Sequence, residues 1–422
     1  MKNASKILAV FVLASLMTPG FIFAKNSDET KFWKVQSIDT MKYSRDLARE
    51  KLNDRSFDKV IDGQIKAIAD TGATHVAIAT PYDSEFAPFL KRWVVSARKH
   101  GLKVWFRGNF SGWEGWFGYS KISREEHTAK TEQFILKNKG LFEDGDIFTA
   151  CPECENGGPG DPRLNRDIDG HRKFLIKEHK VMANVFKKIN RDVIFNYNSM
   201  NGDVAFLIMN KATTSALGGV ITIDHYVKTQ KRLISDIKKL SAQGGGAKIV
   251  LGEFGAPIPD IHGNMSEIDQ AKWIQNALSE LISVPELVGV NYWVNIGGST
   301  ALWDGRLVPR SAVSVLKEFF APAVITGFVK DELGRPIEGV EVKNSYRLTK
   351  TRDNGYFELP YYQYKNDKLN FSKSDFVEKT VSAGSKESEP FLITLERTEE
   401  TFSFRFMKLL KYLASILYLL RD

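Results

Sequence analysis

Cysteine is scarce in this 422-residue sequence, and its two cysteines, Cys151 and Cys154, stand in one C-x-x-C stretch, "FTACPECENGGPGD". A zinc site needs three or four ligands, and the nearest histidines, His127 and His171, lack metal-ligand spacing, so no metal site is predicted. The pair ends a strand rather than opening a helix, which argues against a thioredoxin-like redox motif. Two alternatives remain: a local disulfide in an oxidising compartment, or two buried thiols.

A Gly-rich phosphate turn is also lacking. No such turn follows the first strand-like run, residues 32–39, and "SAQGGGAK" reads as a turn before a later strand. A doubly wound open sheet that binds a dinucleotide is therefore disfavoured, and no cofactor is predicted.

The chain has no concentrated charge of one sign. Its formal charge of +8 comes from basic residues spread along the sequence, so we predict no nucleic-acid partner. An apolar fraction of 43% and an aromatic fraction of 12% are those of a globular protein, and the length suggests two to three domains. The sequence does not indicate an oligomeric state.

Long unbroken apolar runs are confined to the first end of the chain. Residues 1–24, with lysines before an apolar run and an Ala24-Lys25 junction, are typical of a signal peptide, and the alternative is an uncleaved anchor. In either case we expect an exported protein at the periplasm, cell surface or exterior. Residues 402–422 read as an amphipathic helix in which Arg405, Lys408 and Lys411 share one face. Such a helix either lies in a membrane interface or docks on the rest of the chain.

Between these ends, short β-branched runs alternate with amphipathic helical stretches. Near-continuous apolar strands that alternate with helices indicate a parallel sheet buried on both faces. Eight repeats in about 290 residues predict an α/β fold, a (β/α)8 barrel over residues 30–322. The expected strands are residues 32–39, 74–82, 102–110, 145–153, 192–199, 219–227, 248–257 and 287–295.

Polar and aromatic residues gather at the C-terminal end of nearly every expected strand. In a barrel these ends converge on the catalytic face. Two tryptophans after the third strand either line a sugar cleft or pack in the core. The candidate substrate-binding residues are Asp39, Tyr82, Arg107, Asn109, Trp113, Trp116, Asn196, Asn198, Asp224, Tyr226, Asn291 and Trp293.

After Pro322 the helical periodicity disappears, and residues 323–398 predict a small all-β sandwich. This segment resembles the carboxypeptidase regulatory-like, or transthyretin-like, domain family. The resemblance is carried by Gly327, Asp331, the run 334–336 "GRP", Gly339-Val340 and the later "DNGYFELP". It implies an accessory module without catalytic residues.

The barrel resembles the clan A glycoside hydrolases, through Glu153 or Glu155 at the end of the fourth strand and Glu253 in "LGEFG" at the end of the seventh. The resemblance implies Glu253 as nucleophile and Glu153, or Glu155 as the alternative, as general acid/base. It also implies that Tyr226 hydrogen-bonds the nucleophile and that Trp293 forms the sugar platform. Because side chains alternate along a strand, Glu153 and Glu155 are expected to face the same way.

The sequence departs from the family pattern in three places. Pro152 or Cys154 precedes the acid where the family has Asn, Asp224 stands where many relatives have His, and a second-strand Arg is missing, although Arg107 could reach the same space. We expect an exported, retaining glycoside hydrolase that acts on a poly- or oligosaccharide. The alternative is a non-catalytic carbohydrate-binding or cell-surface scaffold protein on the same barrel.

Overall fold

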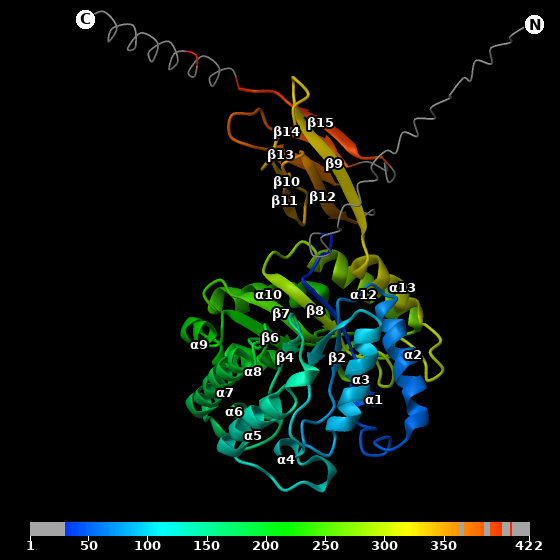
Figure 1. The fold of residues 1–422 in the computed structure, drawn as a ribbon, viewed down its shortest axis with the longest axis vertical. Helices are drawn as coiled ribbons and strands as arrows, with labels where there is room; N and C mark the ends of the chain where they lie inside the picture. The colour runs from blue at the N-terminus through cyan, green and yellow to red at the C-terminus, as the bar shows by residue number, and fades with distance from the viewer. Residues whose placement is uncertain (1–29, 363–366, 384–388, 399–405, 407–422) are drawn as a thin grey trace, which may run out of the picture.

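The computed structural model describes residues 30–362, 367–383, 389–398 and 406, so the expected signal peptide and the C-terminal helix lie outside the described residues. Eight parallel strands form one sheet in the order β4-β3-β2-β1-β8-β7-β6-β5. A parallel bridge between Ile147 and Ile194 closes it into a barrel. The predicted α/β barrel is confirmed (Figure 1). The strands are β1 Val35–Asp39, β2 His75–Ile78, β3 Lys103–Phe106, β4 Ile147–Phe148, β5 Ser199–Asn201, β6 Val220–Asp224, β7 Lys248–Phe254 and β8 Leu287–Tyr292.

Helices cover the outside of the barrel because their apolar stripes pack on the outward-facing residues of the strands. The long covering helices are α2 Asp58–Ala69, α3 Ala87–Lys99, α5 Arg124–Lys137, α7 Ile168–Lys188, α10 Gln230–Gln243, α12 Glu267–Leu281 and α13 Ser311–Phe320. Shorter helices are α1 Met41–Ser44, α4 Ser111–Glu114, α6 Pro162–Asn165, α8 Gly202–Ile208, α9 Lys211–Ala216 and α11 Pro259–His262. The 3-10 turns are η1 Arg55–Phe57, η2 Trp116–Gly118, η3 Lys139–Leu141 and η4 Cys154–Asn156.

The barrel interior is filled in layers, apolar below and polar above. One buried cluster holds Val35, Ala77, Trp105, Tyr197 and Val250 with Ile147. Inward-facing positions alternate along a strand, so the next inward residues of β1, β3 and β8 are polar ones near the C-terminal ends. The apolar layer fills the interior of the barrel. The polar layer lies above it and forms the floor of the mouth, the opening at the C-terminal ends of the strands.

Two small sheets follow the barrel. One has the order β11-β10-β13-β14 and the other β12-β9-β15, and their apolar faces share one core, as in a β-sandwich. The strands are β9 Ala323–Asp331, β10 Glu341–Lys343, β11 Leu348–Lys350, β12 Tyr356–Tyr361, β13 Lys368–Ser372, β14 Lys379–Ser382 and β15 Phe391–Leu395. The expected all-β segment is therefore present, while its resemblance to the regulatory-like family stays a prediction.

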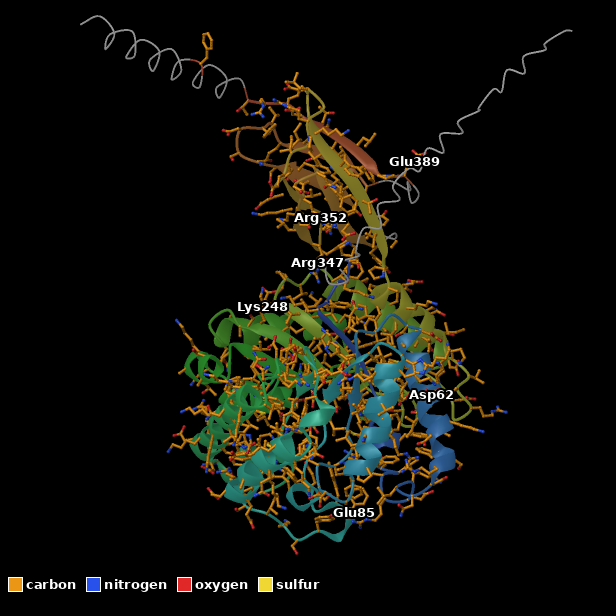
Figure 2. The ribbon with its side chains drawn as sticks, viewed as in Figure 1. Asp62, Glu85, Lys248, Arg347, Arg352 and Glu389 are labelled. Atoms are coloured by element: carbon orange, nitrogen blue, oxygen red, sulfur yellow. A yellow bond between two sulfur atoms is a disulfide. The ribbon has the colours of Figure 1, made fainter. Side chains whose placement is uncertain are left out.

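The sandwich packs on the end of the barrel where the strands begin. Phe32, just before β1, lies edge-on to Tyr346 with ring centroids 5.6 Å apart, and Phe319 of α13 lies 4.8 Å from Tyr362. Figure 2 shows Lys248, the first residue of β7, toward the sandwich and Glu85, which follows β2, at the opposite end. The mouth of the barrel therefore faces away from the sandwich.

Among the described residues, every helix is too short or too polar to cross a bilayer.

Candidate active site

A buried guanidinium organises the floor of the mouth. Arg107, which follows β3 and is 1% exposed, donates to Asp224 at 2.9 Å, to Ser199 Oγ at 3.0 Å and to the carbonyl oxygen of Gly252 at 2.6 Å. Its nitrogens also lie 3.3 Å from Asp39 and 3.4 Å from Glu253. One cation thus contacts carboxylates from three strands, β1, β6 and β7, and compensates part of their buried charge.

Glu253 is held from two sides. Strand β7 carries it into the mouth, where Tyr226 donates its hydroxyl to Oε2 at 2.8 Å and Arg107 approaches Oε1 at 3.4 Å. These contacts fix the carboxylate and favour its ionised form. The expected hydrogen bond between Tyr226 and Glu253 is present in the structure.

Glu153 is presented by an irregular loop rather than by a strand. Strand β4 ends at Phe148, and Glu153 has a left-handed backbone with φ +47° just before η4. Its N–H donates to the carbonyl of Ser199 at 2.8 Å, and its carboxylate accepts from Asn156 at 2.8 Å. Cys151 and Cys154 form a disulfide with Cα atoms 5.2 Å apart, so the first of the two cysteine alternatives is the one observed. The bridge spans the residue that carries the carboxylate.

Glu155 does not enter the mouth with Glu153. The chain leaves the strand before both residues, so the expected alternation fails and the prediction that they face the same way is wrong. Glu155 is 2% exposed, and its Oε1 accepts from the N–H and side-chain amide of Asn201 at 2.6 and 3.0 Å. Of the two candidate acids, Glu153 is the one that approaches Glu253.

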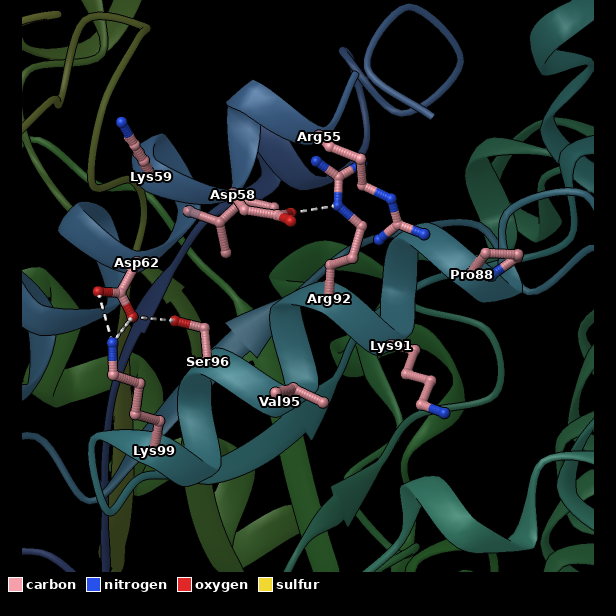
Figure 3. Close-up of a pocket in the computed structure, with 11 residues that line it drawn as sticks. Arg55, Asp58, Lys59, Asp62, Pro88, Lys91, Arg92, Val95, Ser96 and Lys99 are labelled. Carbon is pink, nitrogen blue, oxygen red and sulfur yellow. Dashed lines mark hydrogen bonds and ion pairs between the residues drawn. The ribbon is translucent and has the colours of Figure 1, made fainter. Parts of the chain in front are cut away.

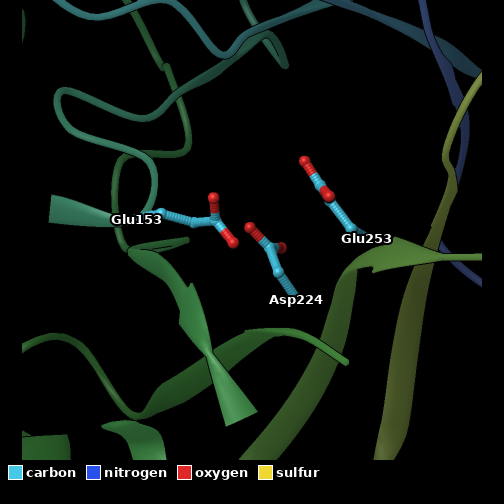
Figure 4. A group of neighbouring side chains, drawn as sticks. All are labelled: Glu153, Asp224 and Glu253. Carbon is cyan, nitrogen blue, oxygen red and sulfur yellow. The ribbon is translucent and has the colours of Figure 1, made fainter. Parts of the chain in front are cut away.

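Three carboxylates from different elements meet in the mouth. Glu153, Asp224 and Glu253 each place one oxygen so that the three oxygens lie within 4.8 Å of one another (Figure 4). A separation of about 5 Å between two carboxyl groups is the spacing of retaining glycosidases, whereas inverting enzymes need room for a water molecule. The arrangement can support attack by one carboxylate while the other transfers a proton.

Burial dominates the acidity of this group. Desolvation and the nearby Glu253 raise the pKa of Glu153 to about 8, and Arg107 acts in the opposite direction. Burial and the carboxylate of Asp224 raise the pKa of Glu253 to about 8, against Arg107 and Tyr226. Burial also raises the pKa of Asp224 to about 7, against Arg107. Glu253 and Asp224 contact the guanidinium of Arg107, and Glu153 does not. When one of the three carboxyl groups is protonated, this geometry therefore favours the proton on Glu153.

Three further predicted residues lie at the mouth. Asp39 is fully buried beside Arg107, and Asn291 donates to the carbonyl of Gly252 at 2.8 Å, so both support the floor. The half-buried Trp293 lies 6.1 Å from the ring of Tyr226, and Lys42 Nζ is 5.8 Å from its centroid. Trp293 therefore lies beside Tyr226, the residue that donates to Glu253.

Two aromatic candidates belong to the core. Tyr82 is 2% exposed, donates to the carbonyl of Thr149 at 2.8 Å and packs among phenylalanine rings outside the sheet. Trp113 is 1% exposed and stacks on Phe174 at 5.0 Å. The prediction that these two residues contact substrate is wrong, because both rings are buried and pack against other aromatic rings. Trp116 remains half-buried, under the guanidinium of Arg45 at 4.7 Å.

The two asparagines expected at the end of the fifth strand precede the paired strand, which begins only at Ser199. Asn196 donates to the carbonyl of Gly218, which lies just before β6 at the other end of the barrel. The prediction that Asn196 binds substrate is wrong, because the paired part of the strand is 199–201 and Asn196 lies before it. Substrate contact by Asn198 stays a prediction.

Ser199 and Glu114 are not among the residues that the sequence predicts, and Asn109, which is predicted, has another role. Ser199 donates to Asp224 at 2.6 Å, and only the correct phase of the fifth strand would have revealed it. Asn109 was expected to bind substrate, but it is fully buried and its amide is occupied by Phe110, His127 and Glu114. The stretch "GWEGWFGYS" is dominated by aromatic residues, and no feature of its sequence singles out Glu114.

A separate hollow of about 650 Å³ lies on the outer wall between α2 and α3 (Figure 3). It is rich in basic side chains, but Lys59 and Lys91 point in different directions, and Lys99 is paired with Asp62 at 2.9 Å. Arg92 is held by Asp58 at 2.5 Å. The cations do not converge on one point, so this hollow lacks the geometry of an anion site.

Comparison with known proteins identifies the fold. No family model matches the chain, and no curated protein sequence matches it. A GH5_18 protein from Bifidobacterium longum subsp. longum, solved as a Glu-to-Ala variant in complex with Manβ1-4GlcNAc, is 14% identical with a TM-score of 0.54, over 72% of this chain and 84% of that one. GH5_18 from Streptomyces cattleya in complex with GlcNAc is 13% identical with a TM-score of 0.51, over 70% and 84%. The chain therefore has a glycoside hydrolase-like barrel fold.

Proposed function

We propose that this chain is an exported retaining glycoside hydrolase in which Glu253 is the nucleophile and Glu153 the general acid/base. The observation that carries the proposal is the meeting of the two carboxylates within 4.8 Å at the C-terminal mouth of the barrel. The barrel's likeness to GH5_18 structures supports the reaction class, and the complexes with Manβ1-4GlcNAc and GlcNAc suggest a β-linked mannoside as the first substrate to test.

In the first step, a Glu253 oxygen attacks the anomeric carbon while the bond from that carbon to the leaving oxygen breaks. Glu153 gives its proton to the leaving oxygen, so the leaving group departs as an alcohol. In the second step, Glu153 takes a proton from water, and the water oxygen displaces Glu253 from the anomeric carbon. Two inversions at that carbon give net retention.

The surrounding residues serve the two carboxylates. Tyr226 and Arg107 contact Glu253 at 2.8 and 3.4 Å, which orients it for attack. Burial, with the negative charge of Glu253 nearby, keeps Glu153 protonated near neutral pH, as a general acid requires. When Glu253 loses its charge by forming the glycosyl ester, the pKa of Glu153 falls, which prepares it to act as a base.

The test is hydrolysis of a panel containing Manβ1-4GlcNAc, other β-linked disaccharides and soluble polysaccharides, by wild type and by Glu253→Gln. We expect turnover of at least one member by wild type and a loss of about 10³-fold or more in the variant, since a nucleophile acts as part of a unit. Glu125→Gln, an exposed carboxylate on α5, is the matched control and should leave activity unchanged.

The alternative is a carbohydrate-binding protein without turnover. Pro152 before Glu153 favours this alternative, because the glycoside hydrolases that the barrel resembles have Asn before the acid. It would bind a panel member with equal affinity in wild type and Glu253→Gln and cleave none.

A further inference from the structure

One half-buried carboxylate beside the acid-bearing loop has no part in the two-glutamate mechanism. Glu114 is the last residue of α4, the short helix that follows β3. Its Oε2 lies so close to Gly157 that a Cβ atom at that glycine would be 3.1 Å from it. Gly157 comes four positions after Glu153 in the same loop. The carboxylate of Glu114 therefore lies against the loop that presents the acid.

Two further contacts tie α4 to that loop. The indole N–H of Trp113 donates to the carbonyl of Cys154 at 3.1 Å, and Gly158 donates its N–H to the carbonyl of Trp113 at 2.8 Å. Both contacts are made by Trp113, the neighbour of Glu114, and they reach Cys154, next to Glu153, and Gly158, further along the same loop. Helix α4 is thus tied to the loop that carries Glu153 by two direct hydrogen bonds.

A buried polar chain fixes the orientation of Glu114. Asn109 donates to Glu114 Oε1 at 3.1 Å, and its own Oδ1 accepts from the N–H of Phe110 at 2.7 Å, which settles which way the amide faces. His127 Nε2 lies 3.0 Å from the same Oδ1, and His127 Nδ1 lies 3.1 Å from Glu178. His127, Asn109 and Glu178 are all at most 1% exposed. This chain holds one oxygen of Glu114 and leaves the other turned to the loop.

The barrel order places Glu114 across the mouth from the nucleophile. Strand β3, which leads to α4, lies four strands from β7 in the closed sheet, and β4 with the acid lies beside β3. Glu114 therefore lies on the same side of the mouth as Glu153, opposite Glu253, and a sugar bound with its leaving group toward Glu153 would have Glu114 on the leaving-group side. Burial raises the pKa of Glu114 to about 7, while Asn109 and Arg45 favour its charged form.

We propose that Glu114 binds a hydroxyl group of the leaving-group sugar, with Oε2 as the acceptor, and so determines which leaving groups the site accepts. This inference rests on the proposed glycosidase function. Among the described residues, Oε2 of Glu114 has no hydrogen-bond donor, so it can accept one from the substrate. A carboxylate acceptor pairs strongly with a hydroxyl donor.

The test compares two substrates that differ only in the leaving group, Manβ1-4GlcNAc and 4-nitrophenyl β-mannoside, or the equivalent pair for the sugar that the panel identifies. With Glu114→Gln we expect kcat/KM for the disaccharide to fall about 10-fold or more, the loss typical of one hydrogen bond to a charged group. For the nitrophenyl glycoside, which offers no sugar hydroxyl on that side, we expect a change of less than about twofold.

Glu114→Asp is a second variant, which keeps the charge but moves the carboxylate back by one methylene. It should also lose activity on the disaccharide and not on the nitrophenyl glycoside. Glu125→Gln is again the control. Equal losses on both substrates would assign Glu114 a purely structural role, and no loss on either would show that it does not touch substrate. Both results overturn the inference while the wild-type turnover still supports the proposed function. Failure of wild type to cleave any panel member would instead remove the proposed function and the inference with it.

Discussion

At the scale of single residues, Arg107 has the widest influence on the site. Its guanidinium is the cation that contacts Asp39, Asp224 and Glu253 together at the mouth. The surrounding carboxylates were expected from their places at strand ends, but the sequence could not show that one side chain would join them. Contacts among residues far apart in the chain depend on side-chain direction, which strand order alone does not supply.

We predict that Arg107→Gln lowers the free energy of unfolding by about 3–5 kcal/mol, because removing one partner leaves buried carboxylates uncompensated. Denaturant unfolding at pH 7 measures this change. Arg163→Gln is the control, since Arg163 pairs with Asp161 and Asp203 near the surface and exposed pairs contribute about 1 kcal/mol or less. Equal effects of the two substitutions would contradict the account.

Glu153 gives a prediction for stability against pH. An unfolded glutamate has a pKa of about 4.3, and burial raises the folded value to about 8. Between these values the folded state binds more protons than the unfolded state, so the contribution of Glu153 to stability declines as pH rises. Gln cannot ionise, so Glu153→Gln should gain stability relative to wild type with rising pH.

Thermal unfolding of wild type and Glu153→Gln at pH 5 and pH 8 measures this gain. We expect the difference in Tm to be larger at pH 8 by roughly 2–4 °C, which corresponds to about 1 kcal/mol in a large domain. A difference that is constant with pH, as expected for Glu125→Gln, would show that Glu153 ionises in the folded protein as freely as in the unfolded chain.

At the scale of elements, the sequence predicts strands with regular cores better than strands that end irregularly. β1, β7 and β8 lie within their expected ranges, and Asp39, Glu253 and Asn291 face the mouth as expected. The fourth and fifth segments pair over only two and three residues, and there the expected side-chain directions are wrong. A one-residue change of phase turns every side chain to the other face.

The disulfide is the element-scale device that shapes the acid loop. Cys151 and Cys154 close a loop of only a few residues around Glu153, so the bridge removes little entropy from the unfolded chain, worth about 2 kcal/mol in the chain-entropy model. We expect the bridge to affect catalysis more than stability, because it holds the Glu153 carboxylate in place and a displacement of about 1 Å can cost about 100-fold in rate.

We therefore predict that Cys151→Ser combined with Cys154→Ser lowers kcat/KM by about 10-fold or more and the free energy of unfolding by about 2 kcal/mol or less. Activity on the best panel substrate and denaturant unfolding provide the two readouts. A large loss of stability with unchanged activity would assign the bridge to folding rather than to the site.

At the scale of the whole molecule, the barrel has two functionally distinct ends. The sandwich covers the end where the strands begin, through Phe32, Phe319, Tyr346 and Tyr362, and the carboxylates lie at the other end. The alternation of strands and helices predicted the barrel, and the loss of helical periodicity predicted the sandwich. Which end of the barrel the sandwich covers could not be predicted from the sequence, because the aromatic contacts come from distant segments.

We propose that residues 402–422 attach the protein to a membrane surface, because their sequence predicts an amphipathic helix with Arg405, Lys408 and Lys411 on one face. We predict that deleting residues 402–422 moves the protein from the membrane fraction to the soluble fraction and changes kcat/KM less than about twofold. Partitioning after cell fractionation measures this, and unchanged partitioning would remove the proposal.

The central claim is that Glu253 forms a covalent bond with the sugar. The most direct measurement is peptide mass spectrometry after incubation with 2-deoxy-2-fluoro glycosides that carry a good leaving group, beginning with the β-mannoside, because slow release lets a glycosyl ester accumulate. The account predicts one added sugar on the peptide containing Glu253, and none in Glu253→Gln. A sugar attached to another residue, or no adduct in wild-type protein that turns over the matching glycoside, would contradict it.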